Sequence, residues 1–190
     1  MPAPRLRLIA LAALATIGLA LAGCSGSVGD QPAGIQVVAS TNVYGSLATT
    51  IGGAQATVTS IIDDPAKDPH EYQADARTQL ALSRAQVVIE NGGGYDDFVG
   101  TLLGGAGNST ATILDAVKIS GFDQTDGLNE HFWYDFPTVK KVAARIAKAL
   151  TALDHSQAAT FAANEKAFNA ALSVLEADDA AIKAGPAAGE

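Results

Sequence analysis

The stretch 35-IQVVASTNVYGSLATTIGG-53 joins an apolar run, an amphipathic run and a glycine pair, in that order. The first six residues, 35–40, are apolar enough to predict a strand. After them, large apolar side chains recur at three- and four-residue steps up to Ile51, which predicts a short helix on one buried face. Gly52 and Gly53 then mark the end of that helix. A strand that leads directly into a helix is half of a βαβ unit, so this stretch predicts an α/β fold.

Three further strands are expected along the chain. Their apolar runs cover residues 57–62, 86–90 and 111–114, and residues 76–84 between two of them have the composition of a helix. Parallel strands that are covered on both faces tend to be continuously apolar, as these runs are. The sequence therefore predicts a four-stranded parallel sheet flanked by helices.

The second half of the chain is predicted to be helical. Residues 139–153 repeat apolar side chains on one face, with Asp135 expected at the N-cap and Pro137 in the first turn. A second pattern, 156–183, is long compared with the usual ~11–12 residues of a globular helix, so it needs a further partner to pack on. The sequence stops soon after Gly185, where such a helix would end, and we expect the chain to be a fragment. The apolar stripe expected on the long helix consists of Phe161, Phe168, Leu172, Leu175 and Ile182.

The N-terminus has the features of an export signal. Residues 1–23 carry Arg5 and Arg7, no acid, and an apolar stretch too short to span a membrane. The sequence L-A-G-C ending at Cys24 resembles a bacterial lipobox, so we expect cleavage before Cys24 and a lipid on its thiol; the alternative is a secretory signal that happens to end near a free thiol. Residues 24–34 would then be a flexible tether, and the protein would lie outside the cytoplasmic membrane, anchored to its outer face.

The charge of the mature chain excludes one class of partner. Removing residues 1–23 takes away two of the 12 basic residues and none of the 20 acidic ones, so the net charge changes from −8 to −10. Such a surface repels nucleic acid, and no basic patch interleaved with aromatic residues argues otherwise.

Two of the three histidines occupy loops that lead into predicted helices. His70 lies in 68-DPHEY-72 after the second strand, and His131 lies in 129-NEHFWYD-135. Loops at the carboxyl ends of the strands form the ligand crevice of an open α/β sheet, and unprotonated imidazole is a common ligand of transition metals. A shared metal site is one reading; two solvated loop histidines are the other, because no short metal motif joins them. Asp68, Glu71 and Asp135 are candidates to orient the imidazoles, whereas His155 is expected to be an exposed residue at the start of the long helix.

These motifs together resemble a known family. The lipobox, VVASTNVYGSLA, DPHEYQ, VVIENGGGYDDFV and NEHFWYD are similar, in this order, to the TroA-like solute-binding lipoproteins, the zinc and manganese receptors of ABC importers. The resemblance implies an N-terminal α/β lobe at 35–154, a connecting helix at 155–184 and, at 185–190, the start of a second α/β lobe that is missing. It also implies that His70 and His131 are metal ligands, and that the remaining ligands lie beyond Glu190.

The expected function is capture of Zn²⁺ or Mn²⁺ and delivery to an ABC permease, by a monomer that is not an enzyme. Because imidazole binds metal only when unprotonated, and its ordinary pKa is about 6.5, affinity should fall below about pH 6. The sequence does not decide between the two metals. Many zinc receptors of this family carry a histidine-rich loop that residues 119–130 lack, which removes one indicator of zinc without establishing manganese. Three alternatives are a surface adhesion lipoprotein with a structural metal, a metal-dependent hydrolase with Glu71 as its base, and a receptor for a small organic ligand.

Overall fold

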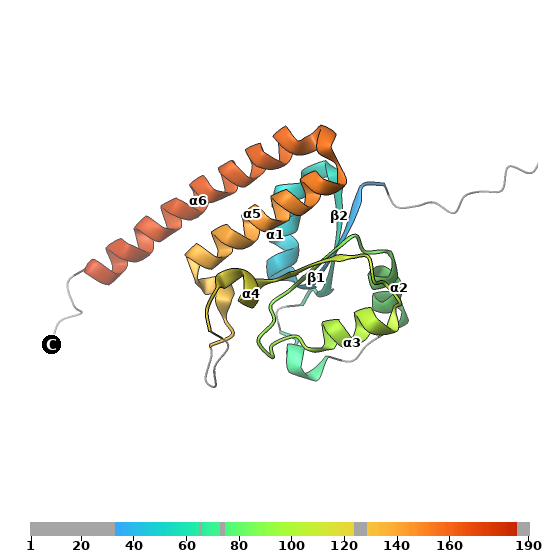
Figure 1. Ribbon diagram of the computed structural model, residues 1–190. Coiled ribbons are helices and arrows are strands. Elements are labelled where there is room, and N and C mark those ends of the chain that lie inside the picture. The colour runs from blue at the N-terminus through green and yellow to red at the C-terminus, as the bar shows by residue number, and fades with distance from the viewer. Residues whose placement is uncertain (1–32, 65, 73–74, 124–128, 186–190) are drawn as a thin grey trace, which may run out of the picture. The chain divides into compact units, whose positions relative to one another are not determined.

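The computed structural model describes residues 33–64, 66–72, 75–123 and 129–185 (Figure 1). The predicted export signal, the lipidation site at Cys24, most of the tether and residues 186–190 lie outside this range. None of the helices in the described ranges is both long enough and apolar enough to cross a membrane.

The centre of the fold is a parallel sheet of four strands in the order β2-β1-β3-β4. All four predicted strands are confirmed to within one residue at each end, which shows that continuous apolar runs were a reliable signal here. The strands are β1 (Ile35–Thr41), β2 (Ala56–Ile62), β3 (Val87–Glu90) and β4 (Thr112–Asp115).

Helices cover both faces of the sheet (Figure 1). On one face, Val37 and Ile89 pack with α1 (Asn42–Gly52) and α5 (Phe136–Leu153). On the other face, Val38 and Val88 pack with α2 (Ala76–Arg84) and α3 (Phe98–Gly105). Neighbouring residues of one strand thus enter opposite halves of the core, because strand side chains alternate between faces. A short helix, α4 (Ala116–Ser120), follows β4.

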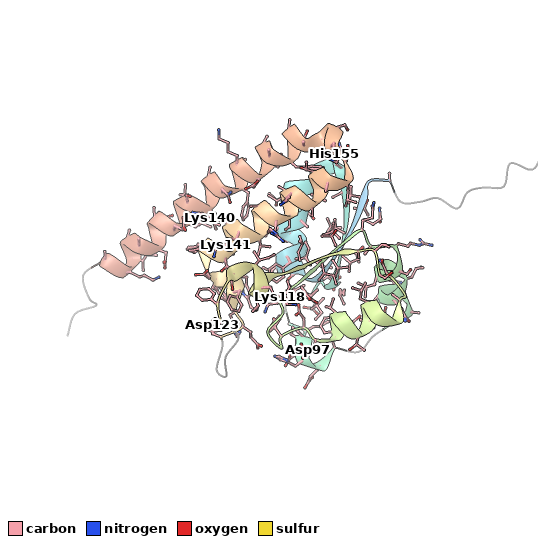
Figure 2. The ribbon with its side chains drawn as sticks, viewed as in Figure 1. Asp97, Lys118, Asp123, Lys140, Lys141 and His155 are labelled. Atoms are coloured by element: carbon pink, nitrogen blue, oxygen red, sulfur yellow. The ribbon has the colours of Figure 1, made fainter. Side chains whose placement is uncertain are left out.

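The long C-terminal helix is confirmed as α6 (Ala158–Ala184), preceded by a 3₁₀ turn at His155–Gln157. It packs on α5 and α1, where Phe161 is buried in the core and the partly buried Phe168 packs against it; Leu172 is buried as well. The rest of the predicted stripe is only partly covered: Leu175 is 55% and Ile182 79% exposed. His155 is exposed at the turn between α5 and α6, as predicted for a residue at the start of the long helix, and lies on the opposite side of the fold from Asp97 (Figure 2).

Candidate metal site

Both loop histidines lie next to the ring of Tyr95, which belongs to the loop after β3. The ring centroids are 5.7 Å apart for His70 and Tyr95, and 6.3 Å apart for Tyr95 and His131. Trp133 completes the group, with its ring 5.0 Å from both Tyr95 and His131. The fold therefore brings together two imidazoles that are far apart in the sequence, on loops at the carboxyl edge of the sheet.

The His70 loop is stiffened by its own sequence. Pro69–Glu71 form a 3₁₀ turn with proline at its start, and the Asp68 carboxylate accepts the backbone N–H of His70 at 2.9 Å. Asp68 thus fixes the backbone that carries the imidazole. This hydrogen bond is to the backbone of His70 and not to its ring. Glu71, the other acid predicted to orient His70, is exposed and lines a separate hollow with Lys67 and Asp68.

The His131 loop uses an asparagine in the same way. The Asn129 side-chain oxygen accepts the backbone N–H of His131 at 3.1 Å and also lies 2.7 Å from Nδ1 of the imidazole. An amide oxygen only accepts hydrogen bonds, so Nδ1 carries a proton and Nε2 of the neutral ring keeps its lone pair. Asp135 accepts the backbone N–H of Thr138 at 2.9 Å and caps α5, so this bond fulfils its predicted N-cap role.

Two residues that the sequence did not single out tie the loops together. Oε1 of Glu130, on the His131 loop, lies 3.3 Å from Nε2 of His70. The backbone carbonyl of the same Glu130 accepts a bond of 2.9 Å from the Asn91 side chain, at the end of β3. Asn91 is fully buried, and its side-chain oxygen accepts the Tyr44 hydroxyl at 2.5 Å. The position of Asn91 directly after a strand was the one signal in the sequence that could have pointed to it.

The floor beside the site is formed by acidic side chains that are buried or half-buried. The carboxylate of buried Asp96 accepts the backbone N–H groups of Asn91 at 2.6 Å and Gly92 at 2.8 Å, and burial raises its pKa. Burial, reinforced by the negative charges of Asp96 and Asp115, raises the pKa of Glu90 to about 7. Gly92 has φ +76°, and a Cβ there would lie 2.4 Å from Oδ1 of Asp115, so this turn requires glycine.

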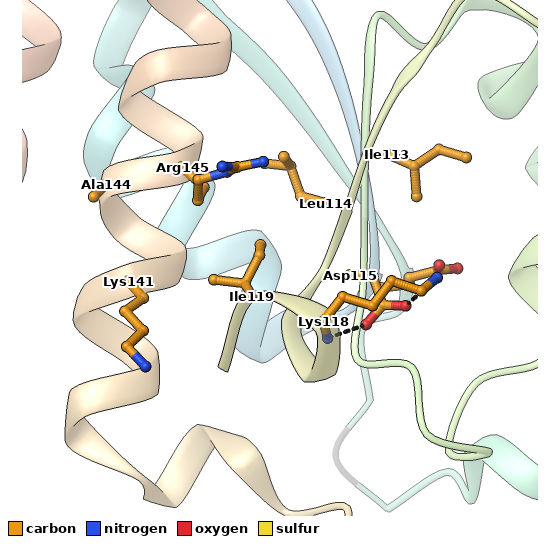
Figure 3. A pocket seen from close by; sticks show the side chains of 9 residues that line it. Ile113, Leu114, Asp115, Lys118, Ile119, Lys141, Ala144 and Arg145 are labelled. Atoms are coloured by element: carbon orange, nitrogen blue, oxygen red, sulfur yellow. Dashed lines mark hydrogen bonds and ion pairs between the residues drawn. The ribbon is translucent and has the colours of Figure 1, made fainter. Parts of the chain in front are cut away.

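A hollow of about 630 Å³ opens next to this acidic floor, between β4 and α5 (Figure 3). Within it, Nζ of Lys118 lies 2.8 Å from Oδ2 of Asp115, and the Lys141 side chain turns away to donate to the Ser120 carbonyl. Two of the three cations that line this hollow, Lys118 and Lys141, are therefore engaged with their own neighbours; the third is Arg145.

The described residues supply only part of the set of ligands that a metal ion needs. Among residues 33–64, 66–72, 75–123 and 129–185, no three His, Cys, Asp or Glu side chains are grouped closely enough to hold an ion. The donors that these contacts bring to the site are two imidazoles and the Glu130 carboxylate. Imidazole and carboxylate together suit divalent transition metals.

The chain is similar to known metal-uptake and metal-binding proteins. Residues 37–188 match the family model described as ZnuA, zinc-uptake complex component A, periplasmic. The manganese-binding lipoprotein MntA of Halalkalibacterium halodurans is 28% identical over 169 residues, which cover 84% of this chain and 54% of that protein.

Solved structures share the fold. A zinc-bound 138–173 deletion mutant of ZnuA superposes with a TM-score of 0.68 at 25% identity, covering 76% of this chain and 56% of that one. The solute-binding protein FpvC of P. aeruginosa, in complex with Ni²⁺, gives a TM-score of 0.68 at 24% identity, with 77% and 54% covered. This chain spans about half the length of the relatives it matches.

The family match covers most of the chain and bears out the resemblance drawn from the sequence motifs. It also argues against the hydrolase alternative, because the matched family is a component of a zinc-uptake complex and the similar protein is a manganese-binding lipoprotein. The chain belongs to the ZnuA family of periplasmic metal-binding proteins, the solute-binding components of metal-uptake complexes.

Proposed function

We propose that this protein captures Zn²⁺ or Mn²⁺ outside the cytoplasmic membrane and delivers it to the membrane subunits of an ABC importer. The observation that carries the proposal is the convergence of His70 and His131 on Tyr95, at the carboxyl edge of the sheet. Capture needs no chemical step: the imidazole nitrogens and further oxygen donors replace part of the hydration shell of the ion.

A lipid on Cys24 would keep the loaded receptor close to its permease. A lipid chain holds a protein at the surface without spanning the bilayer. The acidic net charge of the chain also attracts cations to its surface, although this long-range effect is screened by salt. The remaining ligands would come from a part of the protein that corresponds to the half of its relatives not covered by this chain.

A calorimetric titration with Zn²⁺ and with Mn²⁺ tests the binding step. The protein from Ser25 onward should bind one ion, and His70→Ala should weaken binding by about 10–100-fold or more. His155→Ala is the matched control, because His155 is exposed at the far turn and should leave affinity unchanged. Equal affinities for all three proteins would contradict the proposed site.

A deletion strain distinguishes transport from surface adhesion. A transport receptor predicts poor growth when zinc and manganese are scarce, with growth restored by adding the transported metal. An adhesion lipoprotein with a structural metal predicts no metal-dependent growth defect. The metal that restores growth at the lower concentration identifies the physiological cargo.

A further inference from the structure

Glu130 lies on one histidine loop and contacts the histidine of the other. It directly precedes His131, yet its carboxylate lies next to the imidazole of His70. Its side chain is 25% exposed, whereas that of His70 is 52% exposed, so the contact is open to an ion from solvent. The backbone of Glu130 is fixed by the bond from buried Asn91 to its carbonyl, which limits how far the carboxylate can move away.

The separation of the two groups suits a shared ion better than a direct bond. Nε2 of His70 and Oε1 of Glu130 are 3.3 Å apart. A charge-assisted N–H···O bond is shorter, about 2.7–2.9 Å. Two donors that each lie about 2.0–2.2 Å from one tetrahedral ion are separated by about 3.3–3.5 Å. The two atoms are therefore already spaced as neighbouring ligands.

The second histidine loop is arranged to complement this pair. Asn129 engages Nδ1 of His131, which leaves Nε2 of that ring as its metal-binding nitrogen. Asn129 and Glu130 are adjacent, so one dipeptide acts on both imidazoles. The described part of the chain groups no three donors around one point, so the His70–Glu130 pair is the preformed portion of the site.

We propose that Glu130 is a third protein ligand of the captured ion, supplied by this half of the protein, and that it favours Mn²⁺ over Zn²⁺. This inference rests on the proposed function. A carboxylate is a hard donor that suits Mn²⁺, whereas imidazole suits Zn²⁺. Loss of Glu130 should therefore weaken manganese binding more than zinc binding.

Competition titrations of the full chain against a chromophoric chelator, with each metal in turn, test the assignment. Glu130→Gln keeps the size of the side chain and removes its charge; we expect about 10–100-fold weaker Mn²⁺ binding and a smaller loss for Zn²⁺. Glu130→Asp keeps the charge but shortens the reach, so ligation predicts weakened binding here as well. Asp97→Asn, an exposed acid on the Tyr95 loop, is the matched charge control and should stay within about twofold of the unchanged protein.

The outcomes separate this inference from the proposed function. If Glu130→Gln behaves like Asp97→Asn while His70→Ala loses binding, Glu130 is not a ligand and the receptor site stands. If Glu130→Asp binds as the unchanged protein does, the carboxylate acts only through its charge, and the ligand assignment is wrong. If His70→Ala has no effect or the unchanged protein binds neither metal, both proposals fail. X-ray absorption of the zinc-loaded protein adds a direct readout, because Glu130→Gln should remove one oxygen neighbour at about 2.0–2.2 Å.

Discussion

His70 and His131 each lie two residues after an Asx side chain that accepts the histidine's own backbone N–H, at 2.9 Å for Asp68 and 3.1 Å for Asn129. Each histidine is followed by a capped helix, with Asp75 at the start of α2 and Asp135 at the start of α5. The two loops thus use the same local hydrogen bonding to present an imidazole. They differ in what holds them to the rest of the fold.

A hydrogen bond from the end of β3 holds the His131 loop, whereas no hydrogen bond joins the described residues 66–72 of the His70 loop to the sheet. Asn91, at the end of β3, donates to the Glu130 carbonyl at 2.9 Å and is itself held by Tyr44 from α1. The Asp68 and Tyr72 backbone bonds of the His70 loop stay within residues 68–72, and its imidazole meets the rest of the site through Tyr95 and Glu130. The position of His131 is therefore set by a hydrogen bond to the end of β3, and that of His70 by its side-chain contacts with Tyr95 and Glu130.

The largest effect is expected from removing the link between β3 and the His131 loop. Asn91→Ala leaves the Tyr44 hydroxyl and the Glu130 carbonyl without their partner, so unfolding should become easier by about 2–4 kcal/mol. Metal affinity should fall as well, because the backbone of Glu130 and His131 is released. Urea unfolding and a metal titration measure the two losses.

Asn108→Ala is the control for that variant. Asn108 also links separate segments, donating at 2.8 Å to the carbonyls of Leu82 and Ala85, but it does so at the end of α2 and not at the histidines. We expect Asn108→Ala to lower the free energy of unfolding, as Asn91→Ala does, and to leave the metal affinity unchanged. A loss of affinity in Asn108→Ala equal to that in Asn91→Ala would show that affinity follows global stability and not the Asn91 link.

A pH-dependent effect is expected from Glu90, the residue that precedes Asn91 on β3. Its pKa is raised from 4.5 to about 7 by burial, so the folded protein holds this proton more tightly than the unfolded chain does. The stabilisation is fully present below about pH 4.5 and is lost as the pH rises through about 7, with a magnitude of about 2 kcal/mol for a half-buried group. Glu90→Gln should remove this loss.

The measurement is the free energy of unfolding at several values between pH 5 and 8, for the unchanged protein and for Glu90→Gln. The difference between the two curves isolates Glu90, because every other ionisable group is the same in both proteins. A difference that does not change with pH would mean that the folded environment of Glu90 does not favour its protonated form.

The smallest effects are expected from the two Asx side chains, and they differ in kind. Asp68→Ala and Asn129→Ala each remove one backbone cap, worth about 1 kcal/mol or less at exposed positions. Asn129→Ala also frees Nδ1 of His131, so it should lower metal affinity more than Asp68→Ala does. Equal losses of affinity would contradict the view that Asn129 orients the ring.

The fold and the local form of both loops could be predicted from the sequence because their causes are local. Continuous apolar runs fix the strands, and Asp135 with Pro137 marks the start of α5. Helix α3 was not predicted, since Gly100, Gly104 and Gly105 weaken its helical signal. Periodicity identified the apolar face of α6, and the expectation that this helix needs a further partner agrees with the exposure of Leu175 and Ile182 at its end.

The contacts that organise the candidate site could not be predicted, because they join distant segments. Nothing in N-E-H indicates that Glu130 approaches His70, or that Tyr95 lies next to both imidazoles. Asp68 and Asp135 were expected near the imidazoles, and the bonds they make are to backbone N–H groups. Orientation of a ring depends on partners that only the tertiary fold brings close.

The central claim is that His70 and His131 bind the same ion, and a double-mutant cycle tests it most directly. Zinc affinity and stoichiometry would be measured for the unchanged protein, His70→Ala, His131→Ala and the double variant. One shared ion predicts one Zn²⁺ per chain, about 10–100-fold loss in each single variant, and a double variant much less impaired than the product of the two losses. Losses that multiply, or a stoichiometry of two ions that falls to one in each single variant, would show that the histidines act at separate sites and would contradict the account.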